Sequence, residues 1–394
     1  MSLSPSSAPG AQTPAVDALI AGAIDVVDPA GLERACAACR ATGVVVLDTE
    51  FERTDTFYAR IALVQLWSEG QVWLVDPLRI EDPAPLADLL EDASITKVLH
   101  SASEDVEVLH TWTGARLAGL FDTQLAAAFL GERFGIGYGD LVRSVLGVDL
   151  AKGETRSNWL ARPLSASQHR YACLDVIHLA EIHARQRAQL ELTNRLAWLE
   201  EDCARVVADA LRRPAPEDAW RTVKGAGSLT PRSLAALEDM AAWRERTARE
   251  LDRPRGHIVR DEHLVLLAER LPEQVATLRG DPLPHGLVKR WGDVLQALLD
   301  GARQRPEEAL PAPLPPPPTR AENELLRRLR DIAKRRAREI GLAEELLARK
   351  RLVEPFVLGS EAVPEAYRGW RWPIVGEQLL AARDRPGAVP GRRS

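Results

Sequence analysis

The chain has 394 residues, a mass of 43.4 kDa and a net charge of −6, with 45% hydrophobic and 27% charged residues. This length corresponds to two or three domains at roughly 100 to 200 residues each, and the proportions are those of a globular, core-forming protein. No apolar run approaches the roughly 18 residues of a membrane-spanning helix. Because the first basic residue is Arg34, the N-terminus also lacks the positive region of a secretory signal. We expect a cytoplasmic protein without membrane contact.

The charge is unevenly distributed along the chain. Residues 1–200 contain 16 basic and 27 acidic side chains, a net charge of −11, whereas residues 201–394 carry +5. These totals suit a carboxylate-rich site beside a basic accessory surface, but taken alone they favour ordinary solvated charge.

Four cysteines in a chain of this length cannot form a disulfide framework, which fits a reducing compartment. The spacing of Cys36 and Cys39 indicates two small apolar residues on one helical face rather than a metal or redox site, because no second Cys or His pair lies nearby.

The first half of the chain has the pattern of an α/β domain. Residues 1–21 are mostly Ser, Pro, Ala and Gly, which predicts a disordered lead. Apolar runs at 43–47, 61–67, 72–75 and 97–100 predict four buried strands. Three strands in near succession, followed by strands that alternate with helices, predict a mixed sheet.

Beyond about residue 195 only helical periodicity remains. Helices are predicted at 234–251, 264–270, 286–299 and 322–348. The proline-rich segment 306–319 predicts a stiff polyproline II spacer and a domain boundary.

The candidate functional residues lie where the predicted strands end. Asp48 and Glu50 follow the apolar run 44–47, and a spacing of two on an extended chain points both side chains to one face. Two carboxylates about 4 Å apart repel by roughly 4 kcal/mol at an effective dielectric near 20, so such a pair needs a cation or a raised pKa. Taken alone, the pair also fits solvated turn residues.

Two further acids favour the metal-site interpretation. Asp105 is expected to open a helix beside a strand end, and the i, i+4 spacing of Tyr171 and Asp175 places both on one helical face. Four carboxylates from separate segments can hold two divalent ions, an arrangement that stabilises phosphoryl transfer. All-oxygen ligation selects Mg²⁺ or Mn²⁺ rather than zinc.

Five sequence segments resemble, in the same order, those of bacterial ribonuclease D: VLDTEF at 46–51, KVLHSASED at 97–105, FDTQ at 121–124, SNWLARPL at 157–164 and YACLDV at 171–176. The resemblance implies a 3′-to-5′ exonuclease of the DEDD type, tyrosine subclass, on a ribonuclease H-like fold. It places the metal ligands at Asp48, Glu50, Asp105 and Asp175, and the residue that positions the attacking water at Tyr171.

The resemblance continues into two small all-α HRDC domains. The first includes Trp220, the motif WRE at 243–245 and DRP at 252–254; the second, a divergent copy, includes EELLARKR at 344–351 and GWR at 369–371. The expected organisation is a lead at 1–21, the exonuclease domain at 22–205, HRDC domains at 210–303 and 321–385, a linker at 304–320 and a tail at 386–394.

The implied reaction is hydrolysis of the last phosphodiester of an RNA, with release of nucleoside 5′-monophosphates. Two divalent ions, Mg²⁺ or Mn²⁺, would be held by the four acids, with Asp48 and Asp175 on one ion and Asp48, Glu50 and, through waters, Asp105 on the other. The resemblance suggests that the substrates are transfer RNA precursors with 3′ extensions and that the enzyme is a monomer.

Candidate substrate contacts are less specific. Six residues lie within or beside the motifs: Thr49, Phe51, His100, Lys152, Arg156 and Trp159. His100 also fits a structural histidine, and the aromatic residues also fit core positions. Residues 320–351 carry 11 basic and six acidic side chains, which fits either a solvated helix face or an RNA-binding surface.

Two other functions compete with this one. A DNA exonuclease would use the same carboxylates, although 394 residues leave no room for a polymerase or helicase core. A non-catalytic nucleic-acid-binding adaptor is disfavoured, because converging acids would repel the phosphates that it binds.

Overall fold

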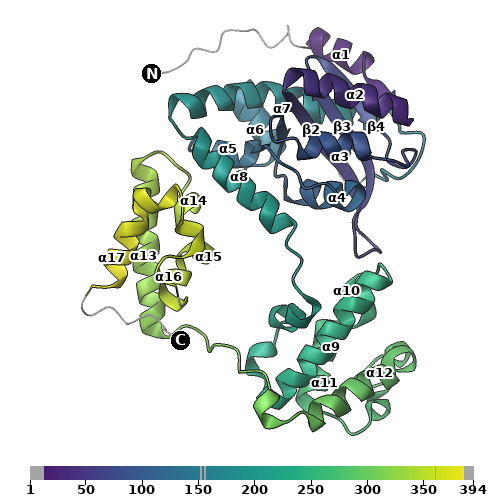
Figure 1. The fold of residues 1–394 in the computed structure, drawn as a ribbon, viewed down its shortest axis with the longest axis vertical. Coiled ribbons are helices and arrows are strands. Elements are labelled where there is room, and N and C mark those ends of the chain that lie inside the picture. The colour runs from purple at the N-terminus through teal and green to yellow at the C-terminus, as the bar shows by residue number, and fades with distance from the viewer. Residues whose placement is uncertain (1–12, 151–152, 155–156, 360, 386–394) are drawn as a thin grey trace. The chain divides into compact units, whose positions relative to one another are not determined.

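The computed structural model describes residues 13–150, 153–154, 157–359 and 361–385 (Figure 1). The chain divides into two compact units. The first contains Met1–Glu52, Ile61–Leu211 and Pro318–Ser394, and the second contains Arg53–Arg60 and Arg212–Pro317. The second unit therefore interrupts the first twice.

A six-stranded mixed sheet forms the centre of the first unit, with the strand order β1-β4-β3-β2-β5-β6. β1 is parallel to β4, β3 is antiparallel to β4, and β5 is parallel to both β2 and β6. The strands are β1 (Ile24–Val26), β2 (Val44–Glu52), β3 (Arg60–Ser68), β4 (Gln71–Val75), β5 (Thr96–Leu99) and β6 (Leu120–Asp122). The predicted mixed α/β sheet is confirmed, and β1 and β6 are additional short edge strands.

The central strand β2 is longer than its apolar run. Backbone pairing continues to Glu52, so Asp48 and Glu50 lie within the strand rather than after it. Val45, Val46 and Leu47 are fully buried. The strand thus passes from the hydrophobic core directly into a polar segment, and its alternating geometry puts the two acids on one face.

Helices cover the sheet of the first unit (Figure 1). They are α1 (Thr13–Ala21), α2 (Pro29–Thr42), α3 (Ala84–Glu91), α4 (Ser103–Thr113), α5 (Thr123–Phe129), α6 (Tyr138–Leu146), α7 (Ala166–Leu192) and α8 (Leu196–Ala210). The long helix α7 begins at a reciprocal cap, in which Ser165 accepts from the backbone of Gln168 and the Gln168 side chain accepts from the backbone of Ser165.

Two features of this region bear on the sequence predictions. Residues 13–21 form α1, which differs from the disorder expected there, because Val16, Leu19 and Ile20 pack against the core. Cys36 and Cys39 are fully buried on one face of α2, as their spacing predicted. Both are free thiols.

The C-terminal helical block shares the hydrophobic core of the sheet domain. Its helices are α13 (Arg320–Glu339), α14 (Glu345–Ala348), α15 (Lys350–Val353), α16 (Pro355–Leu358) and α17 (Glu377–Arg383). The helix predicted over 322–348 ends at Glu339, because Gly341 adopts a left-handed conformation with φ of 66°. On α8, Asp202 binds Arg371 and the indole N–H of Trp370. These contacts attach the block to the sheet domain.

The second unit is helical and has its own core. It contains α9 (Pro231–Glu250), α10 (Arg255–Ile258), α11 (Asp261–Arg270) and α12 (His285–Gln304). The segment Arg53–Arg60, which connects β2 to β3, belongs to this unit: Asp252 accepts hydrogen bonds from the backbone of Phe57 and Tyr58, each at 3.0 Å. Within the part of the chain that the structure describes, no helix is long and apolar enough to cross a membrane.

Candidate catalytic metal site

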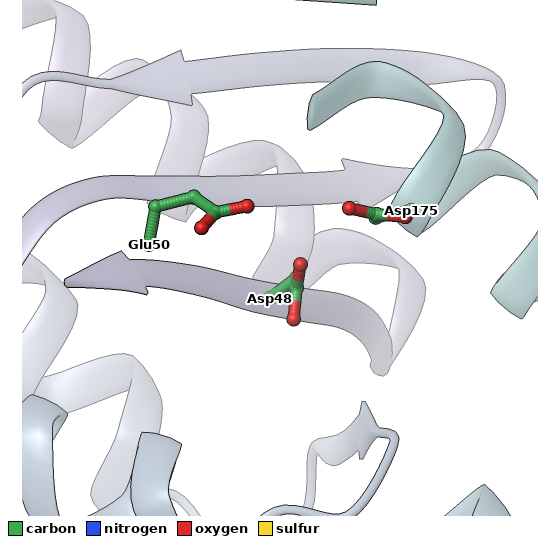
Figure 2. A group of neighbouring side chains, drawn as sticks. All are labelled: Asp48, Glu50 and Asp175. Carbon is green, nitrogen blue, oxygen red and sulfur yellow. The ribbon is translucent and has the colours of Figure 1, made fainter. Parts of the chain in front are cut away.

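Three acidic side chains converge between β2 and α7. Asp48 and Glu50 extend from the same face of β2, and Asp175 extends from α7, which packs against that strand (Figure 2). Carboxylate oxygens of the three residues lie within 4.8 Å of one another. Residues that are 125 positions apart in sequence therefore form one cluster of like charges.

Burial and mutual repulsion raise the pKa values of these carboxylates. The pKa of Asp48 is raised well above its ordinary value by burial, followed by the negative charges of Asp175, Asp105 and Glu50. Burial and the charges of Asp175 and Asp105 raise the pKa of Glu50 to about 8. Burial raises the pKa of Asp175 to about 7, against the opposing effect of a hydrogen bond from Tyr171. Without a cation, the cluster cannot be fully ionised at neutral pH.

The fourth acid, Asp105, lies in the first turn of α4 and is 8% exposed. The hydroxyl of Thr49 donates a hydrogen bond of 2.5 Å to its carboxylate. Burial raises the pKa of Asp105 to about 7, with the Thr49 hydrogen bond acting in the opposite direction. Asp105 is close enough to raise the pKa values of Asp48 and Glu50, yet it stands outside the tight cluster of three.

Tyr171 lies one helical turn before Asp175 on α7, and its hydroxyl hydrogen-bonds to that carboxylate. Burial and the surrounding acids raise the pKa of Tyr171, so the phenol stays protonated at neutral pH. The backbone at Gly153 touches the ring: a Cβ at that position would fall 1.9 Å from Cε2 of Tyr171. Any side chain at residue 153 would require the loop or the ring to move.

A second tyrosine supports the same turn of α7. The hydroxyl of Tyr138 lies 2.9 Å from the carbonyl oxygens of both Leu174 and Asp175, to which it can donate. This contact holds the backbone that carries the Asp175 carboxylate. Tyr138 has no sequence signature of its own, because it lies on α6, outside the five motifs.

Trp159 is 4% exposed and packs against the Tyr171 ring, with ring centroids 5.9 Å apart. This burial favours a core position over a contact with the substrate. Its carbonyl accepts a hydrogen bond of 2.7 Å from Arg162. The Arg162 guanidinium also binds Asp76, so it is occupied within the protein rather than open to a phosphate.

The other residues predicted to contact the substrate have different surroundings in the structure. Both ring nitrogens of His100 have protein partners, the Thr123 hydroxyl at 3.0 Å and the Ile136 carbonyl at 3.1 Å, which favours a structural role. Phe51 is half-buried at the end of β2. Lys152 and Arg156 lie outside the described residues. The substrate-contact assignments stay predictions.

The donor set fits a divalent metal centre. Asp48, Glu50 and Asp175 offer only carboxylate oxygens, the ligands of hard ions such as Mg²⁺ and Mn²⁺. Because their pKa values are raised by mutual repulsion, a bound cation would remove a large part of the cost of gathering these charges.

A mixed sheet that presents converging acids from its central strand, with a tyrosine and an aspartate one turn apart on the facing helix, defines a 3′-5′ exonuclease domain. The family model of the 3′-5′ exonuclease matches residues 24–191, and that of the HRDC domain matches residues 233–298.

Relatives match over almost the whole length. Ribonuclease D of Pseudomonas paraeruginosa is 43% identical, covering 90% of this chain and 96% of the relative. Ribonuclease D of Escherichia coli is 36% identical, covering 87% and 94%. The crystal structure of Escherichia coli RNase D, an exoribonuclease involved in structured RNA processing, superposes with a TM-score of 0.86 at 34% identity, covering 91% of this chain and 98% of that one. The chain belongs to the ribonuclease D family and is a 3′-5′ exoribonuclease.

Proposed function

We propose that this exoribonuclease trims 3′ extensions from transfer RNA precursors in the cytoplasm, acting as a monomer with two divalent ions. The observation that carries the metal-dependent part is the cluster of Asp48, Glu50 and Asp175, whose oxygens lie within 4.8 Å of one another. A site that gathers so much negative charge would repel an RNA phosphate unless cations were bound there.

The four acids have distinct positions in this proposal. Asp48 and Asp175 would hold one ion, while Asp48 and Glu50 would hold the other, with Asp105 contributing through waters. Such ions lower the pKa of a bound water and stabilise the negative charge that develops during phosphodiester hydrolysis. The chain contributes the fixed positions of the ligands, since β2, α4 and α7 all belong to one packed core.

Tyr171 would orient the attacking water. Its pKa is raised, so the hydroxyl is a hydrogen-bond donor rather than a base. Asp175 accepts from that hydroxyl, and Trp159 limits the movement of the ring. The water, the ligand Asp175 and the tyrosine would then be fixed relative to one another.

The RNA assignment rests on the near full-length similarity to ribonuclease D from two bacteria. The decisive experiment is a time course with a 5′-labelled, 3′-extended transfer RNA and a single-stranded DNA that carries the same 3′ sequence. We expect stepwise shortening of the RNA in Mg²⁺ or Mn²⁺, stopping near the mature 3′ end. Faster shortening of the DNA would overturn the substrate assignment, and cleavage that persists in EDTA would overturn the metal dependence.

A further inference from the structure

The helices α13 and α17 pack side by side (Figure 1). A groove lined with arginine side chains lies between them. Its volume is about 460 Å³. Its polar lining comes from both helices. The lining side chains are Arg328, Arg335, Arg336 and Glu339 from α13, Gln378 from α17, and Arg385, which follows α17. Four cations and one anion therefore face this groove.

The arginines face the groove because of helical spacing. Arg328 and Arg335 are seven residues apart, which places them on one face of α13 two turns from each other. Both are exposed, as is Arg385. The two guanidinium groups of α13 thus form a row along the groove, and Arg385 faces them from the α17 side.

Most other basic side chains of α13 are already engaged. Lys334 and Arg338 pair with Glu344, and Arg327 pairs with Glu324. Arg330 donates to the carbonyl of Ala348. Most of the basic side chains of α13 outside the groove are therefore held by neighbouring groups.

Inside the groove the arginines keep free donors. Arg336 is held by Glu339 and by the carbonyl of Ile374. Arg335 and Arg385, in contrast, have no hydrogen-bond or ion-pair partner among the residues that the structure describes. Among the described residues, Arg328 donates only to the carbonyl of Ala382. Three guanidinium groups with unused donors thus converge on a site that contains one carboxylate.

We propose that this groove binds backbone phosphates of the RNA substrate, at a site separate from the catalytic acids. The planar guanidinium fork matches two phosphate oxygens, and successive RNA phosphates can engage successive arginines. Because the catalytic cluster is anionic, a cationic surface elsewhere on the same unit supplies the attraction that the active site lacks. The proposal rests on the exoribonuclease function and adds a phosphate-binding site to it.

The test compares two variants that lose the same charge. One combines Arg328→Gln, Arg335→Gln and Arg385→Gln in the groove. The matched control combines Arg320→Gln, Arg327→Gln and Arg338→Gln, three exposed arginines of α13 that do not line the groove. Binding of a fluorescently labelled single-stranded RNA is measured by anisotropy in EDTA over a series of KCl concentrations, and cleavage of a trinucleotide is measured in Mg²⁺.

Each phosphate contact on single-stranded RNA contributes about 0.7 to the slope of log affinity against log salt. We expect the groove variant to lose about 2 from that slope, the control to lose less than half as much, and trinucleotide cleavage to remain at the wild-type rate in both. Equal losses of salt slope in the two variants would overturn the proposal. Wild-type RNA binding by the groove variant would also overturn it, and would point to an acidic protein segment as the ligand of the groove. Failure of the wild-type enzyme to cleave any RNA would contradict the function while leaving the binding result interpretable.

Discussion

Arg162 donates two parallel hydrogen bonds to Asp76, from Nε to Oδ2 and from Nη2 to Oδ1, both 2.8 Å long. Nη2 also donates to the carbonyl of Ala62 on β3, and Nη1 donates to the carbonyl of Trp159. One guanidinium thereby ties the loop before α7 to β3 and to the residue that directly follows β4. Since Trp159 packs against Tyr171, the ion pair also helps to hold the Tyr171 ring in place.

The substitution Arg162→Lys keeps the charge and loses the fork geometry. Losing this partly buried hydrogen-bond network costs about 1 to 3 kcal/mol of folding stability. Because small shifts of a positioned group can slow a reaction by about 10²-fold, we expect kcat at saturating RNA to fall by about tenfold or more, with a smaller change in KM. The matched control is Arg170→Lys, an exposed α7 arginine paired with Asp17. A variant with wild-type kcat and lower melting temperature would show that Arg162 serves stability alone.

Tyr171→Phe removes the hydroxyl that hydrogen-bonds to Asp175 and leaves the ring against Trp159. Positioned hydrogen-bonding and proton-transfer groups contribute about 10²-fold to 10⁴-fold in rate. We therefore expect single-turnover cleavage to slow by about 10²-fold while Mn²⁺ binding, measured by calorimetry, is retained. Loss of Mn²⁺ binding together with activity would place Tyr171 among the groups that maintain the metal site.

Asp202→Ala tests the attachment of the C-terminal helical block. Asp202 and Arg371 form a buried ion pair, with side chains 7% and 2% exposed. Removing one partner leaves an uncompensated buried charge, which costs about 3 to 5 kcal/mol. The control, Glu191→Ala, breaks the exposed pair with Arg187 and is expected to cost under about 1 kcal/mol. Chemical denaturation that shows equal losses for the two variants would contradict the structural role of the buried pair.

The raised pKa values of the clustered acids predict that stability depends on pH when no metal is bound. Their folded-state pKa values, about 7 for Asp105 and Asp175 and about 8 for Glu50, exceed the ordinary values of 3.8 and 4.5. Between these values the folded protein binds protons that the unfolded chain has already released. Proton binding therefore stabilises the folded state at low pH, and this stabilisation is lost as pH rises from about 4 to about 8.

We therefore expect the melting temperature in EDTA to fall over the upper part of that range and Mg²⁺ to restore it. Asp175→Asn removes one of the repelling charges, so the metal-free variant should be more stable than wild type near pH 8 and should respond less to Mg²⁺. A wild-type melting temperature that is equally insensitive to pH and to Mg²⁺ would show that the acids do not repel as strongly as their positions imply.

Local sequence patterns predicted the elements that carry the acids better than they predicted how those elements pack. The strand positions, the helical placement of Asp105 and the shared helical face of Tyr171 and Asp175 all follow from residue spacing, and the structure has them. The edge strands β1 and β6 are three residues long, too short for a periodic signal. The continuation of β2 through Asp48 and Glu50 depends on pairing with neighbouring strands, which no local pattern contains.

Local sequence patterns could not predict the contacts between distant segments. The hydrogen bonds of Tyr138 to the α7 backbone and the pair formed by Arg162 and Asp76 join residues 36 to 86 positions apart. The proline-rich segment suggested a separate C-terminal domain, yet a buried pair between Asp202 and Arg371 attaches that block to the sheet domain. The basic content of α13 was evident from sequence, whereas the hydrogen bonds and ion pairs that hold most of those side chains were not.

The central claim is that acids from β2, α4 and α7 form one metal-dependent site for RNA hydrolysis. The most direct measurement is the shortening of a 5′-labelled RNA by wild-type enzyme and by Asp48→Asn over a Mn²⁺ titration, with folding monitored by circular dichroism. Asp48 lies at the centre of the cluster, and metal ions supply several kcal/mol of transition-state stabilisation. We predict a folded variant that is slower by about a thousandfold or more at every Mn²⁺ concentration. A folded Asp48→Asn protein that shortens RNA at close to the wild-type rate would contradict the account.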